Sequence, residues 1–188
     1  MNAGLRDLVY IALFAAVTAV LGLAPKIDVG PVPISAQSMG PMLAGAILGA
    51  RAGASSQAVF LALVAAGLPL LSGGRGGLGV FGTPSVGYLI AFPIAAFVIG
   101  ALVERVWSRL TFPTAFAITL LGGVGVIHLL GVIGWALTLY LGGATTFAAA
   151  VTAAVIGDLV FLPGDMAKAF LAASAAMFVK RGYPLIGR

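Results

Sequence analysis

The sequence predicts an all-α integral membrane protein that crosses the bilayer six times. Two observations predict this class. First, 61% of the 188 residues are hydrophobic and only 8% are charged, whereas soluble domains carry about 25% charged residues. Second, the apolar residues form runs of about 20 residues, the length that a helix needs to cross the hydrocarbon core. The chain has room for about five to seven crossings, so we expect one membrane domain over 1–188.

Glycine, proline or charged residues interrupt the apolar runs and set the expected bounds of the helices. Spanning helices are expected at about 6–24, 34–50, 52–70, 87–107, 113–141 and 163–180. The stretch 145–162 is also apolar, and a short interfacial or re-entrant helix is an alternative there. A membrane tolerates such a segment only where protein buries its backbone.

Positive charge predicts the orientation, because short cytoplasmic loops are enriched in Lys and Arg. If the N-terminus is cytoplasmic, the outer loops hold only Lys26 and Arg75. The inner segments then hold Arg6, Arg51, Arg105, Arg109, Lys180, Arg181 and Arg188. We therefore expect a multi-pass protein of the cytoplasmic (inner) membrane with both termini in the cytoplasm. Because the basic residues form no stripe, nucleic acid is not an expected partner.

Several kinds of chemistry are not expected of this chain. It has no cysteine, which excludes disulfides, thiol catalysis and cysteine-bound metals. His128 is the only histidine, and with no adjacent carboxylate in the sequence it is expected to be a hydrogen-bonded interior residue rather than a metal ligand. No Gly-Lys-Ser/Thr phosphate loop is present. Ser85 and His128 could be imagined as an intramembrane protease pair, but "GTPSVGY" lacks the G-x-S-x-G arrangement that exposes a nucleophile.

The segment "PGDMAK", from Pro163 to Lys168, places two charges inside an apolar region. Pro163 and Asp165 suit the first turn of a helix, where the dipole favours a carboxylate. Lys168 does not, because a cation there opposes the dipole and an ion within the bilayer costs at least ~2.5 kcal/mol. Asp165 and Lys168 are neighbours on a helix, so they form either a structural ion pair or a site for a polar ligand.

The stretch "SGGRGGLGVFGTPSVGY", from Ser72 to Tyr88, is rich in glycine. A flexible linker is one interpretation, but such linkers consist mostly of Gly and Ser. This stretch also carries apolar and aromatic side chains that can dock, which favours a packed binding loop. Its glycines would let the backbone approach a ligand closely; they are Gly73, Gly74, Gly76, Gly77, Gly79, Gly82 and Gly87.

The first apolar run carries two pairs of alanines four residues apart, Ala12 with Ala16 and Ala15 with Ala19. Small residues at this spacing let two helices approach closely in lipid. The pairs indicate either a docking surface for a partner helix or internal packing.

Three segments together resemble the BioY family, the biotin-specific substrate-binding (S) components of energy-coupling factor (ECF) transporters. They are "PVPISAQSMG" from Pro31, "GLPLLSGGRGGLGVFGTPSVGYLIAF" from Gly67, and "DLVFLPGDMAK" from Asp158. The resemblance covers nearly the whole chain. It implies a six-helix bundle with an outward-facing pocket that is capped by the first outer loop and the loop after the third helix.

The resemblance also implies roles for individual residues. The biotin pocket would contain Asp165, Lys168 and Tyr88, with Gln37, Gly74 and Gly76 from the shared motifs. Arg75 stands where the family pattern has an asparagine that contacts the ureido ring, so Arg75 is a candidate partner for the vitamin's carboxylate. Lys168 would meet either the ureido oxygen or that carboxylate.

The function that the resemblance implies is high-affinity biotin binding and uptake, with no catalysis. Biotin is the transported ligand, and no cofactor or metal is expected. The implied partners are the ECF transmembrane coupling protein, docked on the alanines of the first helix, and the ATP-binding subunits. The lipid bilayer surrounds the chain. A homo-oligomer is a further alternative. The alternatives are an S component for another vitamin, an intramembrane enzyme that uses Ser85 and His128, and a structural or channel-type bundle.

Overall fold

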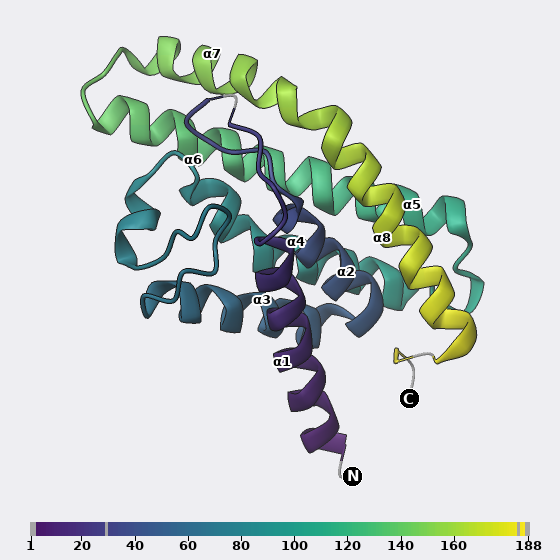
Figure 1. Ribbon diagram of the computed structural model, residues 1–188. Helices are drawn as coiled ribbons and strands as arrows, with labels where there is room; N and C mark the ends of the chain where they lie inside the picture. Colours follow the sequence, from purple (N-terminus) through teal and green to yellow (C-terminus); the bar gives the residue numbers. More distant parts are fainter. Residues whose placement is uncertain (1–2, 29, 184, 187–188) are drawn as a thin grey trace.

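The computed structural model describes residues 3–28, 30–183 and 185–186, and these residues are mostly α-helical (Figure 1). The α-helices are α1 (Ala3–Leu21), α2 (Met39–Leu48), α3 (Ala50–Ala65), α4 (Val86–Arg105), α5 (Phe112–Leu120), α6 (Ile127–Leu141), α7 (Phe147–Asp158) and α8 (Leu162–Gly182). Short 3-10 turns are η1 (Ala36–Ser38), η2 (Leu78–Gly82), η3 (Trp107–Arg109) and η5 (Leu159–Phe161), and η4 (Leu121–Val126) is a π-helical turn.

Four helical stretches among the described residues are long and apolar enough to cross a membrane. They are Gly4–Leu21, Val86–Arg105, Phe112–Leu141 and Phe147–Gly182. The third joins α5, η4 and α6 without a break, and the fourth joins α7, η5 and α8. Large apolar side chains are exposed on these helices, and a surface of this kind suits lipid better than water.

Two helices differ most from the sequence predictions. The helix expected from residue 34 begins at Met39, because Ile34 instead pairs with Ile27 through two backbone hydrogen bonds of 2.9 and 3.0 Å. The helix expected over 52–70 ends at Ala65, where Gly67 has a φ of 104° and turns the chain away. Within residues 145–162, α7 continues through η5 into α8. Pro163 does not break this helix because it lies in the first turn of α8, where no partner for a backbone N–H is needed.

Helix α4 lies at the centre of the bundle and packs on α2, α3 and α6. Helix α8 packs on α5 and α2, and α1 packs on α3 and α2 (Figure 1). One apolar core fills the space among α2, α4, α5 and α8, with buried Met42, Ile99, Val103 and Ala172. A second core lies among α1, α3, α4 and α6 and contains Phe60, Val64, Phe92 and Ile127.

Glycines allow α4 and α6 to approach each other closely. A Cβ atom on Gly87 would collide with the backbone carbonyl of Leu130, and one on Gly131 would collide with the ring of Tyr88. Close backbone approach through small residues is the usual way for helices to associate in lipid. As a result, Tyr88 of α4 lies against α6, with its ring centroid 6.4 Å from that of His128.

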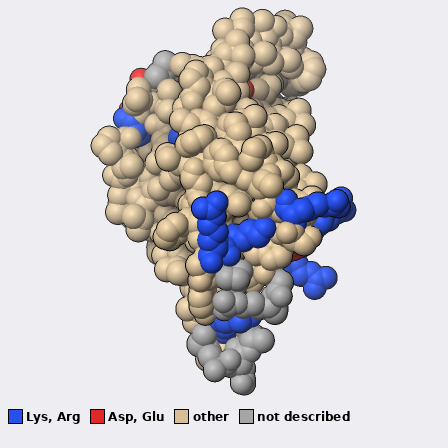
Figure 2. All heavy atoms as spheres, turned by 90° about the vertical axis from the view of Figure 1, so that its right-hand side faces the viewer, with Lys and Arg blue, Asp and Glu red and all other residues tan. Residues whose placement is uncertain are grey.

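Basic residues gather at one end of the bundle. Figure 2 shows the Lys and Arg side chains of one face mainly in its lower part, and Figure 1 places the start of α1 and the end of α8 toward the same lower end. There, Lys180 donates to the carbonyls of Trp107 and Leu110 at 2.7 and 3.1 Å. Arg188, which the sequence analysis assigned to the inner side, lies outside the described residues.

Gly49 forms the sharp corner between α2 and α3. Its backbone has φ 86° and ψ −175°, a region that is essentially restricted to glycine. Glu104, near the end of α4, accepts a hydrogen bond of 2.8 Å from the backbone N–H of Ala50. The carboxylate therefore lies at the N-terminus of α3, where the helix dipole favours negative charge.

We predict that Gly49→Ala destabilises the fold by at least about 1–3 kcal/mol, because alanine is strained at this φ and its methyl group would collide with the Glu104 carboxylate. Thermal unfolding of the purified protein in detergent measures the change. Gly4→Ala is the control, since Gly4 lies in α1 with no atom within 4 Å of the added methyl group. An equal melting temperature for the two variants would contradict the prediction.

Candidate ligand-binding site

A cavity lies between the loop that precedes α2, the loop that follows α3, and helices α4, α6 and α8. Its walls combine apolar and polar side chains. The apolar ones are Val32, Pro33, Ile34, Leu71, Leu89, Phe92, Ile127 and Phe161. The polar ones are Ser35, Gln37, Ser38, Ser72, Arg75, Ser85, Tyr88, Asp165 and Lys168. Small-molecule sites have this composition, an apolar hollow with a few polar groups placed on its walls.

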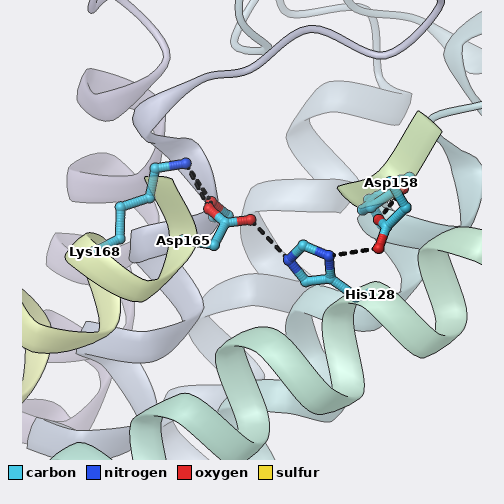
Figure 3. Close-up of polar contacts among 6 residues, drawn as sticks. His128, Asp158, Asp165 and Lys168 are labelled. Carbon is cyan, nitrogen blue, oxygen red and sulfur yellow. Dashed lines mark hydrogen bonds and ion pairs between the residues drawn. The ribbon is translucent and has the colours of Figure 1, made fainter. Parts of the chain in front are cut away.

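Next to the polar wall, a buried histidine is held between two carboxylates, one of which, Asp165, lines the cavity (Figure 3). His128 Nδ1 lies 2.8 Å from Asp158 Oδ2, and His128 Nε2 lies 2.9 Å from Asp165 Oδ2. All three side chains are buried. The histidine comes from the first turn of α6, and the carboxylates come from the end of α7 and the first turn of α8. The bridge therefore fixes α6 against the junction of α7 and α8.

Further hydrogen bonds extend this bridge at both ends. Tyr88 Oη donates to Asp158 Oδ1 at 2.6 Å. At the other end, Lys168 Nζ and Ser38 Oγ both donate to Asp165 Oδ1, at 2.6 and 2.8 Å. Lys168 also donates to Ser38 Oγ at 3.0 Å. One network thus joins α4, α6, α7, α8 and the turn before α2.

The charges in this network compensate one another. An ionised carboxylate only accepts hydrogen bonds, so His128 either donates from both nitrogens as a cation or shares one proton with a carboxyl group. With a cationic His128 and Lys168, the two aspartates are balanced, which is how buried charges are tolerated. Asp165 Oδ1 has two partners, whereas Oδ2 has only His128 among the described residues. Asp165 Oδ2 therefore keeps capacity to accept one more hydrogen bond.

Most of the candidate residues from the sequence line this cavity. Asp165, Lys168, Tyr88, Arg75 and Gln37 all contribute to its walls. The loop after α3 is packed rather than a flexible linker, because Leu71 and Val80 are buried.

Two predicted site glycines are not among the lining residues. Gly74 has a φ of 71° and Gly76 lies against the carbonyl of Leu68, so both shape the loop instead of lining the cavity.

Gln37 connects the two loops of the site. Its side-chain amide donates to the carbonyls of Thr18 and Leu70 at 3.2 and 2.8 Å. Its carbonyl oxygen accepts from the backbone N–H of Ser72 at 2.8 Å. Gln37 therefore uses most of its hydrogen-bonding capacity inside the protein, and its main role is to position the loops.

His128 is a buried, hydrogen-bonded residue, as expected, but nothing in the sequence indicated that its partners are carboxylates. Asp158 and Asp165 are 30 and 37 residues away along the chain, so only the pairing of α6 with α7 and α8 brings them together. Ser38 and Asp158 also belong to the network, although neither was among the predicted site residues. One signal was available, because Asp158 precedes Asp165 by seven residues, which places both on one face of a continuous helix.

Ser85 and His128 do not form a catalytic pair. Both ring nitrogens of His128 face aspartates, and Ser85 Oγ has no hydrogen-bond partner in the described part of the chain. A serine without a base in contact is not an activated nucleophile.

The alanines of α1 divide into two groups. Ala15 is buried in the core beside Phe60 and Val64, and Ala19 packs against the same cluster. Ala12 and Ala16 are exposed. Ala15 and Ala19 therefore pack inside the bundle, the alternative that the spacing left open, whereas Ala12 and Ala16 face outward.

Comparison with known proteins identifies the family. The model of the BioY family matches residues 1–185. The chain is 44% identical to the biotin transporter BioY of Rhizobium etli, with 96% of each chain covered, and 39% identical to the probable biotin transporter BioY of Bacillus subtilis, with 96% of this chain and 94% of that one covered. It is also similar to the crystal structure at 2.1 Å of the S-component for biotin from an ECF-type ABC transporter, with a TM-score of 0.86, 34% identity, and coverage of 98% of this chain and 95% of that one. The chain belongs to the BioY family.

Proposed function

We propose that this chain is the biotin-binding S component of an ECF-type transporter and takes up biotin across the cytoplasmic membrane. Proteins named as biotin transporters match nearly its whole length, and a solved S-component for biotin has the same fold. The observation that carries the proposal is the cavity wall formed by Asp165, Lys168 and Ser38. It offers an anionic acceptor, a cationic donor and a hydroxyl group to a small polar ligand. The role is binding and transport, without catalysis.

The cavity suits the parts of a biotin molecule. Asp165 Oδ2 can accept a hydrogen bond from a ureido N–H, since one of its acceptor positions is open. Apolar side chains such as Leu89, Phe92 and Phe161 can surround the fused rings. Each buried polar group of a ligand that lacks a partner costs about 1–3 kcal/mol, so a few fixed contacts select strongly among vitamins.

The proposed topology has six crossings, with both termini in the cytoplasm and the cavity open to the outside. The crossings are α1, α2, α3, α4, α5 with α6, and α7 with α8. Helices α2 and α3 are short, with 10 and 16 residues, and α2 is mostly buried by its neighbours. The gathering of Lys and Arg at the end that holds the start of α1 and the end of α8 supports this orientation (Figures 1 and 2).

The chain contains no phosphate-binding loop for ATP, so energy for concentrative uptake comes from partner subunits. The exposed pair Ala12 and Ala16 offers a place where the helix of a transmembrane coupling protein can approach the backbone of α1 closely. The ATP-binding subunits then act through that coupling protein.

We predict that Asp165→Asn weakens biotin binding at least tenfold, which corresponds to about 1.4 kcal/mol. The reason is that an asparagine amide accepts hydrogen bonds more weakly than a carboxylate, and the substitution removes the anion that contacts both Lys168 and His128. Titration of monodisperse purified protein with labelled biotin measures the change. Asp7→Asn is the control, because Asp7 is an exposed residue of α1. Unchanged affinity in folded Asp165→Asn protein would remove Asp165 from the site.

The proposed orientation predicts which positions a membrane-impermeant thiol reagent reaches in whole cells. The chain has no cysteine of its own, so single cysteines give no background. Gly79→Cys, in the loop after α3, should react from outside, whereas Ser108→Cys, in η3, should react only after the membrane is permeabilised. Both residues are exposed. The reverse pattern would overturn the orientation.

For partner docking, we predict that Ala16→Trp leaves biotin affinity within about threefold, or roughly 0.65 kcal/mol, but abolishes co-purification of the coupling protein and reduces uptake. A bulky side chain prevents close helix approach while the cavity is unaffected. Ala153→Trp is the matched control, since Ala153 is an exposed alanine of α7. Normal uptake and co-purification with Ala16→Trp would show that this face of α1 does not dock a partner.

A further inference from the structure

Two buried hydroxyl groups in the cavity wall lack hydrogen-bond partners. Among the described residues, the buried side-chain polar atoms without a partner are Ser72 Oγ, Ser85 Oγ and Trp135 Nε1. Ser72 is 1% exposed and Ser85 is 4% exposed. Both serines line the cavity that also contains Asp165 and Lys168. In native proteins, roughly 90% or more of buried polar groups are paired, so two such exceptions in one cavity wall point to a partner that the cavity receives.

The backbones of both serines are fixed, so the hydroxyls have little freedom to find partners inside the protein. The Ser72 N–H donates to Gln37 at 2.8 Å, and the Ser72 carbonyl accepts from Arg75 Nε at 3.3 Å. The Ser85 carbonyl accepts from the N–H of Leu89 at 3.1 Å in the first turn of α4. Each hydroxyl can only rotate about its own side-chain bond, and it keeps one O–H to donate.

Arg75 adds a positive charge beside these hydroxyls. Its guanidinium group is bound to the carbonyl of Ser72, and its side chain lines the same cavity. In residues 3–28, 30–183 and 185–186, no ion pair joins Arg75 to a carboxylate. Lys168, by contrast, is already bound to Asp165 and Ser38. A guanidinium group with unused N–H donors next to O–H donors favours a carboxylate as the partner.

We propose that Ser72, Ser85 and Arg75 form a subsite that binds the carboxylate of the ligand. This inference rests on the proposed function, because it names the part of biotin that the subsite holds. The cavity then has two polar regions of opposite character. Asp165 accepts hydrogen bonds from the ureido ring, and the two serines with Arg75 donate hydrogen bonds to the carboxylate of the side chain.

The test measures Ser72→Ala and Ser85→Ala against two ligands, biotin and its methyl ester, in which the carboxylate charge is absent. Both affinities are obtained by competition with labelled biotin, a method that reaches weak ligands. Each substitution should weaken biotin binding about tenfold, as expected for a hydrogen bond to a charged group, and should change the affinity for the ester by less than about twofold. Equal losses for both ligands would place the hydroxyls elsewhere on the ligand, and unchanged biotin affinity would remove them from the site.

A second measurement separates ligand binding from folding. In ligand-free protein, removal of an unpaired buried hydroxyl should leave the melting temperature unchanged or raise it. Ser56→Ala is the control, because the buried Ser56 hydroxyl donates to the Gly53 carbonyl at 2.7 Å and accepts from Gln57 at 3.1 Å. This variant should lower the melting temperature and leave affinity unchanged.

The outcomes of both measurements are distinct. A lower melting temperature in Ser72→Ala or Ser85→Ala would show that these hydroxyls have partners within the protein, and would overturn the inference. Failure of the unaltered protein to bind biotin would instead refute the proposed function itself.

Discussion

The architecture of the site depends on the need to neutralise two carboxylates inside an apolar bundle. Asp158 and Asp165 are buried, and a buried charge without a partner costs several kcal/mol. His128 contacts both, so one side chain from α6 neutralises charges at the end of α7 and at the start of α8. The bundle can place these acids in its interior only because α6 lies directly alongside. Loss of that bridge would leave acidic side chains in contact with apolar neighbours and would separate the helices that form the cavity wall.

The same requirement explains why Lys168 is found early in α8. Its position opposes the helix dipole, but Asp165 and Ser38 supply hydrogen bonds of 2.6 and 3.0 Å. Lys168 and Ser38 together saturate Asp165 Oδ1 and hold the carboxylate in one orientation. The second oxygen is thereby directed toward His128 with acceptor capacity left over. A carboxylate fixed in this way loses little conformational entropy when a ligand binds, which favours affinity.

Composition and the length of the apolar runs were sufficient to predict a helical membrane protein, and the "PGDMAK" segment was sufficient to locate one end of the polar network. The role of His128 could not be predicted in the same way, because its partners are distant in sequence and belong to other helices. The π-helical turn at Leu121–Val126 adds a further obstacle. Such a turn has more residues than an α-helical one, so it changes the face on which every later residue of the helix lies. Periodicity counted through 113–141 therefore cannot show which neighbouring helix His128 faces.

The separation of the alanine pairs in α1 has a similar origin. Both pairs have the same spacing, and spacing alone does not show which face of a helix meets the rest of the bundle. Burial of Ala15 beside Phe60 and exposure of Ala16 follow from the way α1 packs on α3. That packing is set by side chains such as Thr18, which is hydrogen-bonded to Gln57 of α3 at 3.1 Å.

The three hydrogen bonds of Gln37 have a consequence for how a ligand enters. The side-chain amide of Gln37 is hydrogen-bonded to the backbone of Thr18 in α1, Leu70 and Ser72. These bonds join the loop before α2 and the loop after α3 to each other and to α1. Neither loop can swing open alone without breaking buried hydrogen bonds. Opening the cover of the cavity therefore requires both loops to move together, or these buried hydrogen bonds to break.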